Sequence, residues 1–204
     1  MTVISNGTNL INNGTLDSGV ATGKMTLIKT LTASSSATLS FVDGAASVVL
    51  DSTYDSYVFK CINIHPATDN VSFQINFRDG GTNYDATKTT TFFRAFHTEA
   101  DATGFGYATA VDLAQSTSSQ TINWNLGNGN DESGCSTIQL FNPSSTTFVK
   151  HFIVRSTDYG EDNSIGDRFI AGYCNVTAAI DGVQFSFSSG NIDSGVIKLY
   201  GIGG

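Results

Sequence analysis

The strongest constraint on the fold of this chain is a two-residue alternation of apolar and polar side chains. In the segment 71–77, Val71, Phe73, Ile75 and Phe77 alternate with three polar residues. Successive side chains of a β-strand point to opposite faces of a sheet, so this segment is predicted to be a strand with one buried face and one solvated face.

Similar strand-like runs recur along the chain and are separated by turn residues such as Asp43-Gly44. The runs cover 24–33, 37–41, 56–64, 71–77, 89–97, 122–126, 136–142, 147–155, 168–177, 183–187 and 195–202. A helical period is hard to find, because the best candidate, 108–115, is too short for more than one or two turns. We therefore expect an all-β, antiparallel β-sandwich of about eleven strands.

An internal echo refines this architecture. Asn63, Ala67, Asp69, Val71 and Phe73 recur in the same order 112 residues later, and a second, looser echo links 31–39 with 140–148. If the echo is real, two related halves, about 24–80 and 137–204, share one core, as the paired Greek keys of a jelly roll do. The alternative is chance similarity among low-complexity strands.

The length and charge of the chain limit its domain organisation and its partners. Its 204 residues suffice for one sandwich with a sizeable core, which we assign to 24–204. The polar segment 1–23 is interpreted as an arm or irregular leader. With 18 acidic residues against 10 Lys and Arg, the net charge is −8, so nucleic acid is not an expected partner.

Neither a membrane segment nor a cysteine framework is expected. The start of the chain lacks the basic and apolar stretches of a secretory signal, and no run is long enough for a membrane span, so a soluble protein without membrane insertion is expected. The cysteines, Cys61, Cys135 and Cys174, are odd in number and lack CxxC spacing, and we interpret them as buried small hydrophobic residues.

Candidate catalytic groups are sparse, and we expect no enzyme and no cofactor. None of the three histidines, His65, His97 and His151, sits in a triad-like motif, and each is interpreted as an ordinary surface or interface residue. Glycosidases need only two carboxylates, so Glu99 and Asp162 would be the first candidates for a polysaccharide-cleaving activity. We interpret them instead as solvated loop residues.

Two further sets of side chains are candidate binding groups. The segment 158–167 could offer oxygen ligands to Ca²⁺ from Asp158, Glu161, Asp162 and Asp167, but it lacks the EF-hand spacing, so no metal site is expected.

Tyr107 and Tyr159 are the candidates for stacking on sugar rings, whereas Trp124 alternates with apolar neighbours and is interpreted as core. Phe92 and Phe93 place apolar groups on both faces of one strand, which indicates either a central position in the sandwich or burial by a partner subunit.

Four segments carry a family resemblance. They are Thr22-Gly-Lys-Met-Thr-Leu-Ile-Lys-Thr30, Tyr57-Val-Phe-Lys60 with Ile64-His-Pro-Ala-Thr-Asp69, Phe141-Asn-Pro-Ser-Ser-Thr-Thr-Phe-Val-Lys-His151 and Ser189-Gly-Asn-Ile-Asp-Ser-Gly-Val-Ile-Lys-Leu-Tyr-Gly201. The chain resembles a family of virion structural proteins from tailed phages of marine bacteria, of the cyanophage and pelagiphage kind. The resemblance implies a place in a virus particle but transfers no functional residues.

The expected function is that of a non-enzymatic structural component of a virion. We expect an exterior accessory protein, a capsid decoration or tail-associated subunit, which forms homo-oligomers and packs against other virion proteins. The arm could then lie along a neighbour as an added strand. The alternative is a receptor-binding module of a tail fibre or spike that recognises a host surface glycan through loop aromatics.

Overall fold

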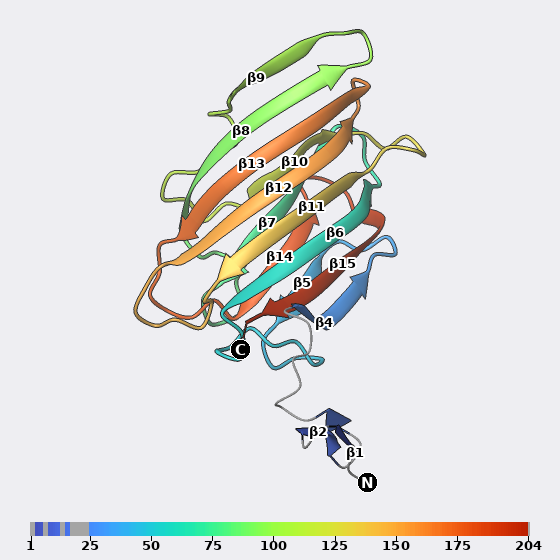
Figure 1. Ribbon diagram of the computed structural model, residues 1–204. Helices are drawn as coiled ribbons and strands as arrows, with labels where there is room; N and C mark the ends of the chain where they lie inside the picture. The colour runs from blue at the N-terminus through green and yellow to red at the C-terminus, as the bar shows by residue number, and fades with distance from the viewer. Residues whose placement is uncertain (1–2, 6–7, 13–14, 17–24, 204) are drawn as a thin grey trace.

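The computed structural model describes residues 3–5, 8–12, 15–16 and 25–203. Within these residues every regular element is a β-strand, and none of them forms a helix that could cross a membrane. The expected all-β fold is therefore confirmed, as an antiparallel, jelly-roll-like sandwich with two layers (Figure 1).

The first layer is a sheet of eight antiparallel strands, which we call the front sheet. Its order is β9-β8-β13-β12-β11-β6-β15-β4. The strands are β4 (Met25–Thr32), β6 (Ser56–Pro66), β8 (Lys88–Thr98), β9 (Thr103–Tyr107), β11 (Gly134–Phe141), β12 (Lys150–Gly160), β13 (Ser164–Cys174) and β15 (Ile192–Ile202). Five of them, β6, β8, β12, β13 and β15, are eleven residues long, and Figure 1 shows the strands of this sheet running side by side.

The second layer is a smaller sheet of four strands in the order β10-β7-β14-β5. Its members are β5 (Leu39–Val42), β7 (Val71–Arg78), β10 (Gln120–Leu126) and β14 (Gly182–Phe187). A single pairing, Leu126 with Gly160, joins β10 to β12 and so connects the layers at one side. In Figure 1 this sheet lies behind the front sheet and covers one face of it.

Phenylalanine rings from both layers form the core. Phe185 of β14 lies 5.6 Å from Phe59 of β6 and 5.7 Å from Phe73 of β7, measured between ring centroids. Phe77 and Phe152 meet across the layers at 4.9 Å. All five rings are fully or almost fully buried, because the alternation found in the sequence turns one face of each strand inward.

The predicted strands correspond closely to the observed ones, with one omission. Eleven runs were expected in the sandwich, and each corresponds to a strand of the two layers. The strand that was missed is β9, whose sequence Thr-Gly-Phe-Gly-Tyr contains two glycines. The segment 108–115, the best helical candidate, contains turns and no helix.

The echo in the sequence corresponds only in part to the structure. The first echo describes the same connection twice, since β6 to β7 and β13 to β14 both cross from the front sheet to the back sheet. The second echo does not, because β4 to β5 crosses between layers whereas β11 and β12 are neighbours in one sheet.

The N-terminal segment was interpreted as an arm or irregular leader. Its described parts form three short strands, β1 (Val3–Ser5), β2 (Thr8–Asn12) and β3 (Thr15–Leu16). They pair only with one another among the described strands, in a separate antiparallel sheet. The remaining positions of 1–23 lie outside the described residues.

A buried lysine lies on the inner face of β8. Lys88 is fully buried, and its Nζ donates hydrogen bonds to Asn76 Oδ1 at 2.6 Å and to Ala86 O at 2.9 Å. Burial lowers the pKa of the Lys88 ammonium from 10.5 to about 8. Between these two pKa values, Lys88 is mostly protonated in the unfolded chain and mostly neutral in the folded protein. The free energy of unfolding should therefore rise as the pH rises from about 8 to 10.5.

We expect this effect to appear as a difference between the unaltered protein and Lys88→Met. From about pH 7 to about pH 9.5, the unfolding free energy of the unaltered protein should rise by about 2 kcal/mol relative to the variant. Urea unfolding of both proteins at both pH values measures this difference. The buried thiols of Cys61 and Cys174 are present in both proteins, so their contribution cancels. A difference that stays constant with pH would contradict the prediction.

Candidate functional site

The candidate site is the outer face of the front sheet, the face turned away from the back sheet. On β12 the side chains alternate strictly, so that Phe152, Val154 and Ser156 are buried while Ile153 and Arg155 are exposed. The neighbouring strands have the same alternation in register. No described strand covers this face.

Apolar side chains gather on this outer face. Of the eleven large apolar residues that are exposed in the described part of the chain, nine lie on it; Ile4 and Phe148 are the other two. The nine are Met25, Leu27, Ile62, Phe93, Phe105, Tyr107, Ile153, Ile165 and Phe169. Exposed apolar area concentrated on one face in this way usually marks a site of interaction.

One row of cross-strand partners runs over all eight strands of this face. It reads Tyr107, Phe93, Phe169, Arg155, Thr137, Lys60, Lys198 and Thr30. Three aromatic residues occupy one end and three cations follow. Phe93 and Tyr107 meet edge to face at 5.2 Å between centroids.

The charge of this row contrasts with the net charge of −8 of the whole chain. Arg155 is paired with Asp167, which lies on the neighbouring row, at 2.5 Å and 2.6 Å. Lys60 and Lys198 stand directly opposite each other on β6 and β15, and neither has an ion-pair partner among the described residues. Two like charges in this position repel each other, so an anion placed over them would be favoured.

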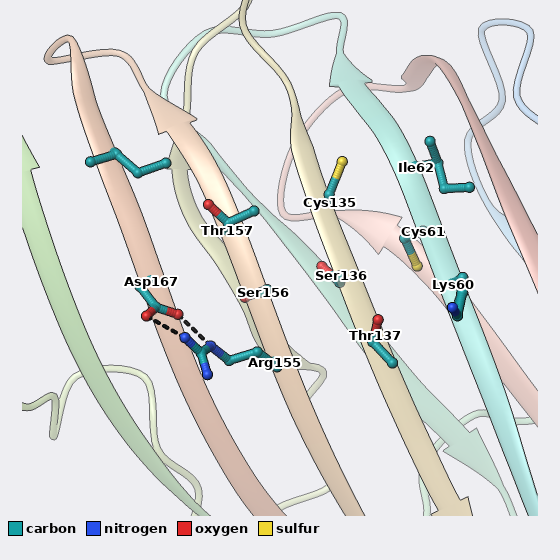
Figure 2. Close-up of a pocket in the computed structure, with 11 residues that line it drawn as sticks. Lys60, Cys61, Ile62, Cys135, Ser136, Thr137, Arg155, Ser156, Thr157 and Asp167 are labelled. Atoms are coloured by element: carbon teal, nitrogen blue, oxygen red, sulfur yellow. Dashed lines mark hydrogen bonds and ion pairs between the residues drawn. The ribbon is translucent and has the colours of Figure 1, made fainter.

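Two shallow hollows lie on the face, one on each side of Arg155. The first, of about 570 Å³, is lined by residues of β6, β11, β12 and β13, and Figure 2 shows Ile62, Cys135 and Thr157 around it with the Arg155–Asp167 pair at its border. The second, of about 420 Å³, is lined mainly by apolar groups that include Phe93, Ile153 and Phe169. The Arg155 guanidinium stacks on the Phe169 ring at 3.8 Å from its centroid.

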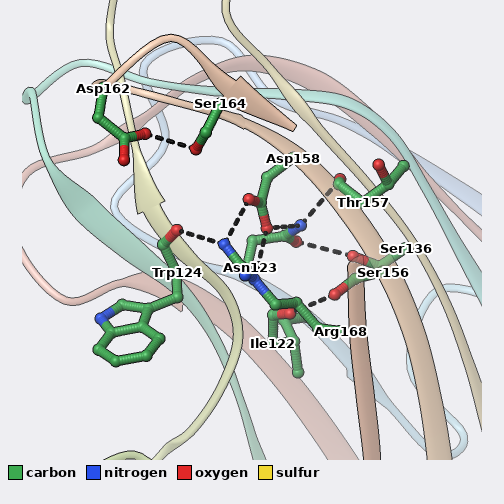
Figure 3. A network of polar contacts seen from close by, with 10 residues as sticks. All are labelled: Ile122, Asn123, Trp124, Ser136, Ser156, Thr157, Asp158, Asp162, Ser164 and Arg168. Carbon is green, nitrogen blue, oxygen red and sulfur yellow. Dashed lines mark hydrogen bonds and ion pairs between the residues drawn. The ribbon is translucent and has the colours of Figure 1, made fainter. Parts of the chain in front are cut away.

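Beneath the face, a buried polar network fixes β12 and β13 to β10. Figure 3 shows its centre, where Asp158 accepts two hydrogen bonds from Arg168, at 2.8 Å and 3.3 Å. Asn123 donates to Asp158 Oδ2 at 3.2 Å and accepts from Ser136 Oγ at 2.7 Å. Arg168 Nη2 also donates to the Trp124 carbonyl. Burial raises the pKa of the Asp158 carboxyl, and the Arg168 guanidinium opposes that rise.

The four acids considered as calcium ligands do not converge. Asp158 points inward to Arg168, whereas Asp167 lies on the outer face with Arg155. Glu161 accepts from Asn70 Nδ2 at 3.2 Å, and Asp162 accepts from Ser164 Oγ. The described residues contain no cluster of three or more His, Cys, Asp or Glu side chains that could hold a metal ion.

Both tyrosines proposed for glycan contact lie on the outer face, but apart from each other. Tyr107 is on β9 and Tyr159 on β12, three strand spacings away, and Tyr159 also lies four residues along β12 from Arg155, the residue in the row of Tyr107, so about 20 Å separates them. The Tyr107 hydroxyl donates to Asp112 at 2.6 Å, and the Tyr159 hydroxyl contacts Glu99 at 3.3 Å. Only Tyr107 stands in the aromatic row.

The three histidines lie at or near the surface. His97 pairs with Asp101 at 3.1 Å and His65 lies 3.6 Å from Asp193, while His151 is exposed beside Tyr173.

Trp124 was expected in the core. It is partly buried and packs against the core.

The cysteines were all expected to be buried. Cys61 and Cys174 are, but Cys135 is half-buried on the outer face and lines the first hollow, so that expectation was wrong for one of the three.

Sequence reasoning missed most of the face. Phe93 was noted because Phe92 beside it is also apolar, and the same signal exists at Phe169 and Ile170 on β13. Lys60 and Lys198 carried no signal, since they are 138 positions apart and only strand pairing brings them together. Comparison of the chain with protein-family models, with curated proteins and with solved structures found no match.

Proposed function

We propose that this chain is a non-enzymatic structural subunit of a tailed-phage virion, an exterior accessory protein that acts by protein–protein contact through the outer face of its front sheet. The observation that carries the proposal is the collection of nine exposed apolar side chains on this one face. The resemblance of four segments to virion structural proteins supports a place in a virion, and the outer face is the surface through which the chain would bind another virion protein.

The size of the face suits a stable interface. Eight strands about 4.8 Å apart and five rows of outward side chains give a surface of roughly 34 Å by 27 Å, on the order of 900 Å². A standard interface buries about 800 Å² on each partner. The face can therefore carry an ordinary protein–protein interface without help from the loops.

The charges of the face indicate the chemistry of its partner. Three cations, Arg155, Lys60 and Lys198, lie in its central row, and the row beside it holds the single acid Asp167. A second copy of the same face, stacked so that the two Lys60–Lys198 pairs are opposed, would bring four unpaired lysines together, which disfavours that arrangement. We assign the face to a different virion protein, one whose apolar surface carries a carboxylate opposite Lys60 and Lys198.

Phe169 is the expected centre of this interface. Its ring is 41% exposed, lies between Phe93 and Arg155, and borders the second hollow. We expect Phe169→Asp to weaken binding to particles that lack the chain by about 30-fold, the effect of losing a central anchor worth about 2 kcal/mol. Occupancy of the particles at a series of protein concentrations measures this.

The control is Phe148→Asp. Phe148 is 71% exposed but lies on the loop between β11 and β12, away from the face, so binding should not change. Mass spectrometry of purified particles should detect the chain in many copies, and a map of the particle should have the front sheet against another protein. Particles without the chain, or equal binding by the two variants, would overturn the proposal.

A second candidate function is favoured by the aromatic row. Tyr107, Phe93 and Phe169 adjoin a hollow that also offers the polar groups of Thr91 and Gln139, a combination that suits the faces and hydroxyls of sugar rings. A receptor-binding module of this kind would bind host cells as a purified protein, and would lose binding when the surface glycan is removed. A subunit that only attaches to the particle would not bind the cells.

A further inference from the structure

The edge strand β9 has none of the usual protection against pairing with another strand. It contains no charged residue, no proline and no bulge, and its pairing with β8 is regular. Phe105 at its centre is 79% exposed, more than any other large apolar residue in the described part of the chain. Natural edge strands usually carry lysine, proline or a bulge that prevents association, so an edge without them is suited to pairing.

The other end of the front sheet differs. The edge strand β4 is irregular in its pairing with β15 at Leu199 and Tyr200, and it carries Lys29. Figure 1 shows β9 as the outermost strand at the opposite edge, with no other labelled strand beyond it.

The hydrogen bonds of β9 identify which backbone groups face outward. Thr98 N donates to Ala102 O, and Ala108 N donates to Phe92 O, so these pairs are bonded across the ladder. In an antiparallel ladder, bonded pairs alternate with non-bonded pairs. Positions 102 and 108 are bonded to β8, so the alternation makes 104 and 106 bonded as well. The residues between them, Thr103, Phe105 and Tyr107, have N–H and C=O groups that point away from β8.

These three residues form a self-complementary set. If a second β9 pairs antiparallel with the first and the two Phe105 residues are opposite each other, then Thr103 of one copy lies opposite Tyr107 of the other. Each of the three positions is then a bonded pair, which gives two hydrogen bonds per pair and leaves none of the outward groups unpaired. This arrangement has a twofold axis at Phe105, which is the symmetry of most dimers.

The side chains agree with this register. Phe105 and Tyr107 both belong to the outer face, so the aromatic groups of the two copies would adjoin across the axis. The strand itself carries no charge, and the nearest acids, Asp101 and Asp112, flank its two ends instead of meeting their own copies at the axis. No acid therefore lies at the axis, and the Asp101 end of one strand lies beside the Asp112 end of the other.

We propose that two copies of this chain associate through their β9 strands, in a twofold antiparallel pairing centred on Phe105 that joins the two front sheets into one. This inference goes beyond the proposed function, because the β9 edge lies beside the outer face and leaves it free for another partner. Formation of this dimer does not depend on which protein covers the outer face.

Phe105→Pro tests the pairing, because the Phe105 N–H points away from β8. Proline there removes only the outward donor and keeps the bonds to β8, as proline in edge strands does. We expect the dimer dissociation constant to rise at least 100-fold by sedimentation analysis, with an unchanged circular dichroism spectrum. The matched variant Phe105→Thr keeps the N–H and should weaken the dimer by a smaller factor.

Cross-linking tests the register without relying on that variant. In a Cys135→Ser background, Phe105→Cys should form an intermolecular disulfide under mild oxidation, since bonded partners lie about 5.5 Å apart between Cα atoms, within the range of a disulfide. Tyr107→Cys should not, because the two copies of position 107 would be about 13 Å apart.

A monomeric protein at millimolar concentration would overturn the inference. So would a dimer that persists in Phe105→Pro, or one that cross-links equally well through position 107. None of these results bears on Phe169 and particle binding, so the two proposals can fail separately.

Discussion

Asp158→Asn is expected to lower the free energy of unfolding by about 3–5 kcal/mol, whereas Asp167→Asn should lower it by less than about 1 kcal/mol. Both acids form an ion pair with an arginine between β12 and β13. The difference is burial. The Asp158–Arg168 side chains are 0% and 5% exposed, and the Asp167–Arg155 side chains are 35% and 58% exposed.

The physical reason is the charge that remains after the substitution. Without the Asp158 carboxylate, the Arg168 guanidinium would be charged and buried with only a neutral amide beside it, and its Nη1 already has no hydrogen-bond partner among the described residues. The Arg155 guanidinium would remain hydrated on the outer face. Burial raises the pKa of the Asp158 carboxyl and the Arg168 guanidinium opposes that rise, so the loss comes from breaking a buried pair whose two charges compensate each other.

Urea unfolding of both variants and the unaltered protein at about pH 7 measures the two effects. The close packing around the buried pair supports the large value, since a Cβ added at Gly166 would collide with Asp158 Oδ1 and Arg168 Nη2. Equal losses from the two variants would mean that the buried network contributes no more than a surface contact.

Phe185→Ala is expected to destabilise the fold by about 3–5 kcal/mol, the range for removing a buried aromatic ring. Phe185 lies on β14 in the back sheet, and its ring contacts Phe41, Phe59 and Phe73. Its loss would therefore open a cavity at the point where the two layers meet, and the neighbouring rings are held by their own strands and can close it only in part.

The matched control is Phe148→Ala, which removes the same ring from a side chain that is 71% exposed and should change stability by no more than about 0.5 kcal/mol. Thermal or urea unfolding compares the two. Phe185→Leu should fall between them, and so provides a measurable value if Phe185→Ala does not fold. A loss below about 1 kcal/mol for Phe185→Ala would show that the two layers do not depend on this ring.

The strands of the sandwich could be predicted because their signal is local. The alternation at Val71 to Phe77 reflects the geometry of a single strand, and the same rule located ten further strands. It failed at β9, where Phe105 and Tyr107 alternate with two glycines, which leave no polar side chains to mark the opposite face. That strand exists because β8 offers it a ladder of partners, and its own residues do not indicate it.

The candidate sites, in contrast, depend on which strands are neighbours. Asp158 and Asp167 looked alike as loop acids, yet one faces the core and the other faces outward, because β12 and β13 continue further than expected and their register decides the side of each residue.

The local pattern of the chain was enough to predict the all-β class, eleven of the twelve sandwich strands and the turns between them, since alternation and turn chemistry act between near neighbours in the sequence. Only the folded arrangement brought Lys60 beside Lys198, aligned Phe169 with Phe93 and left the β9 edge open. Strand order and register arise from contacts between distant segments, which no local pattern encodes.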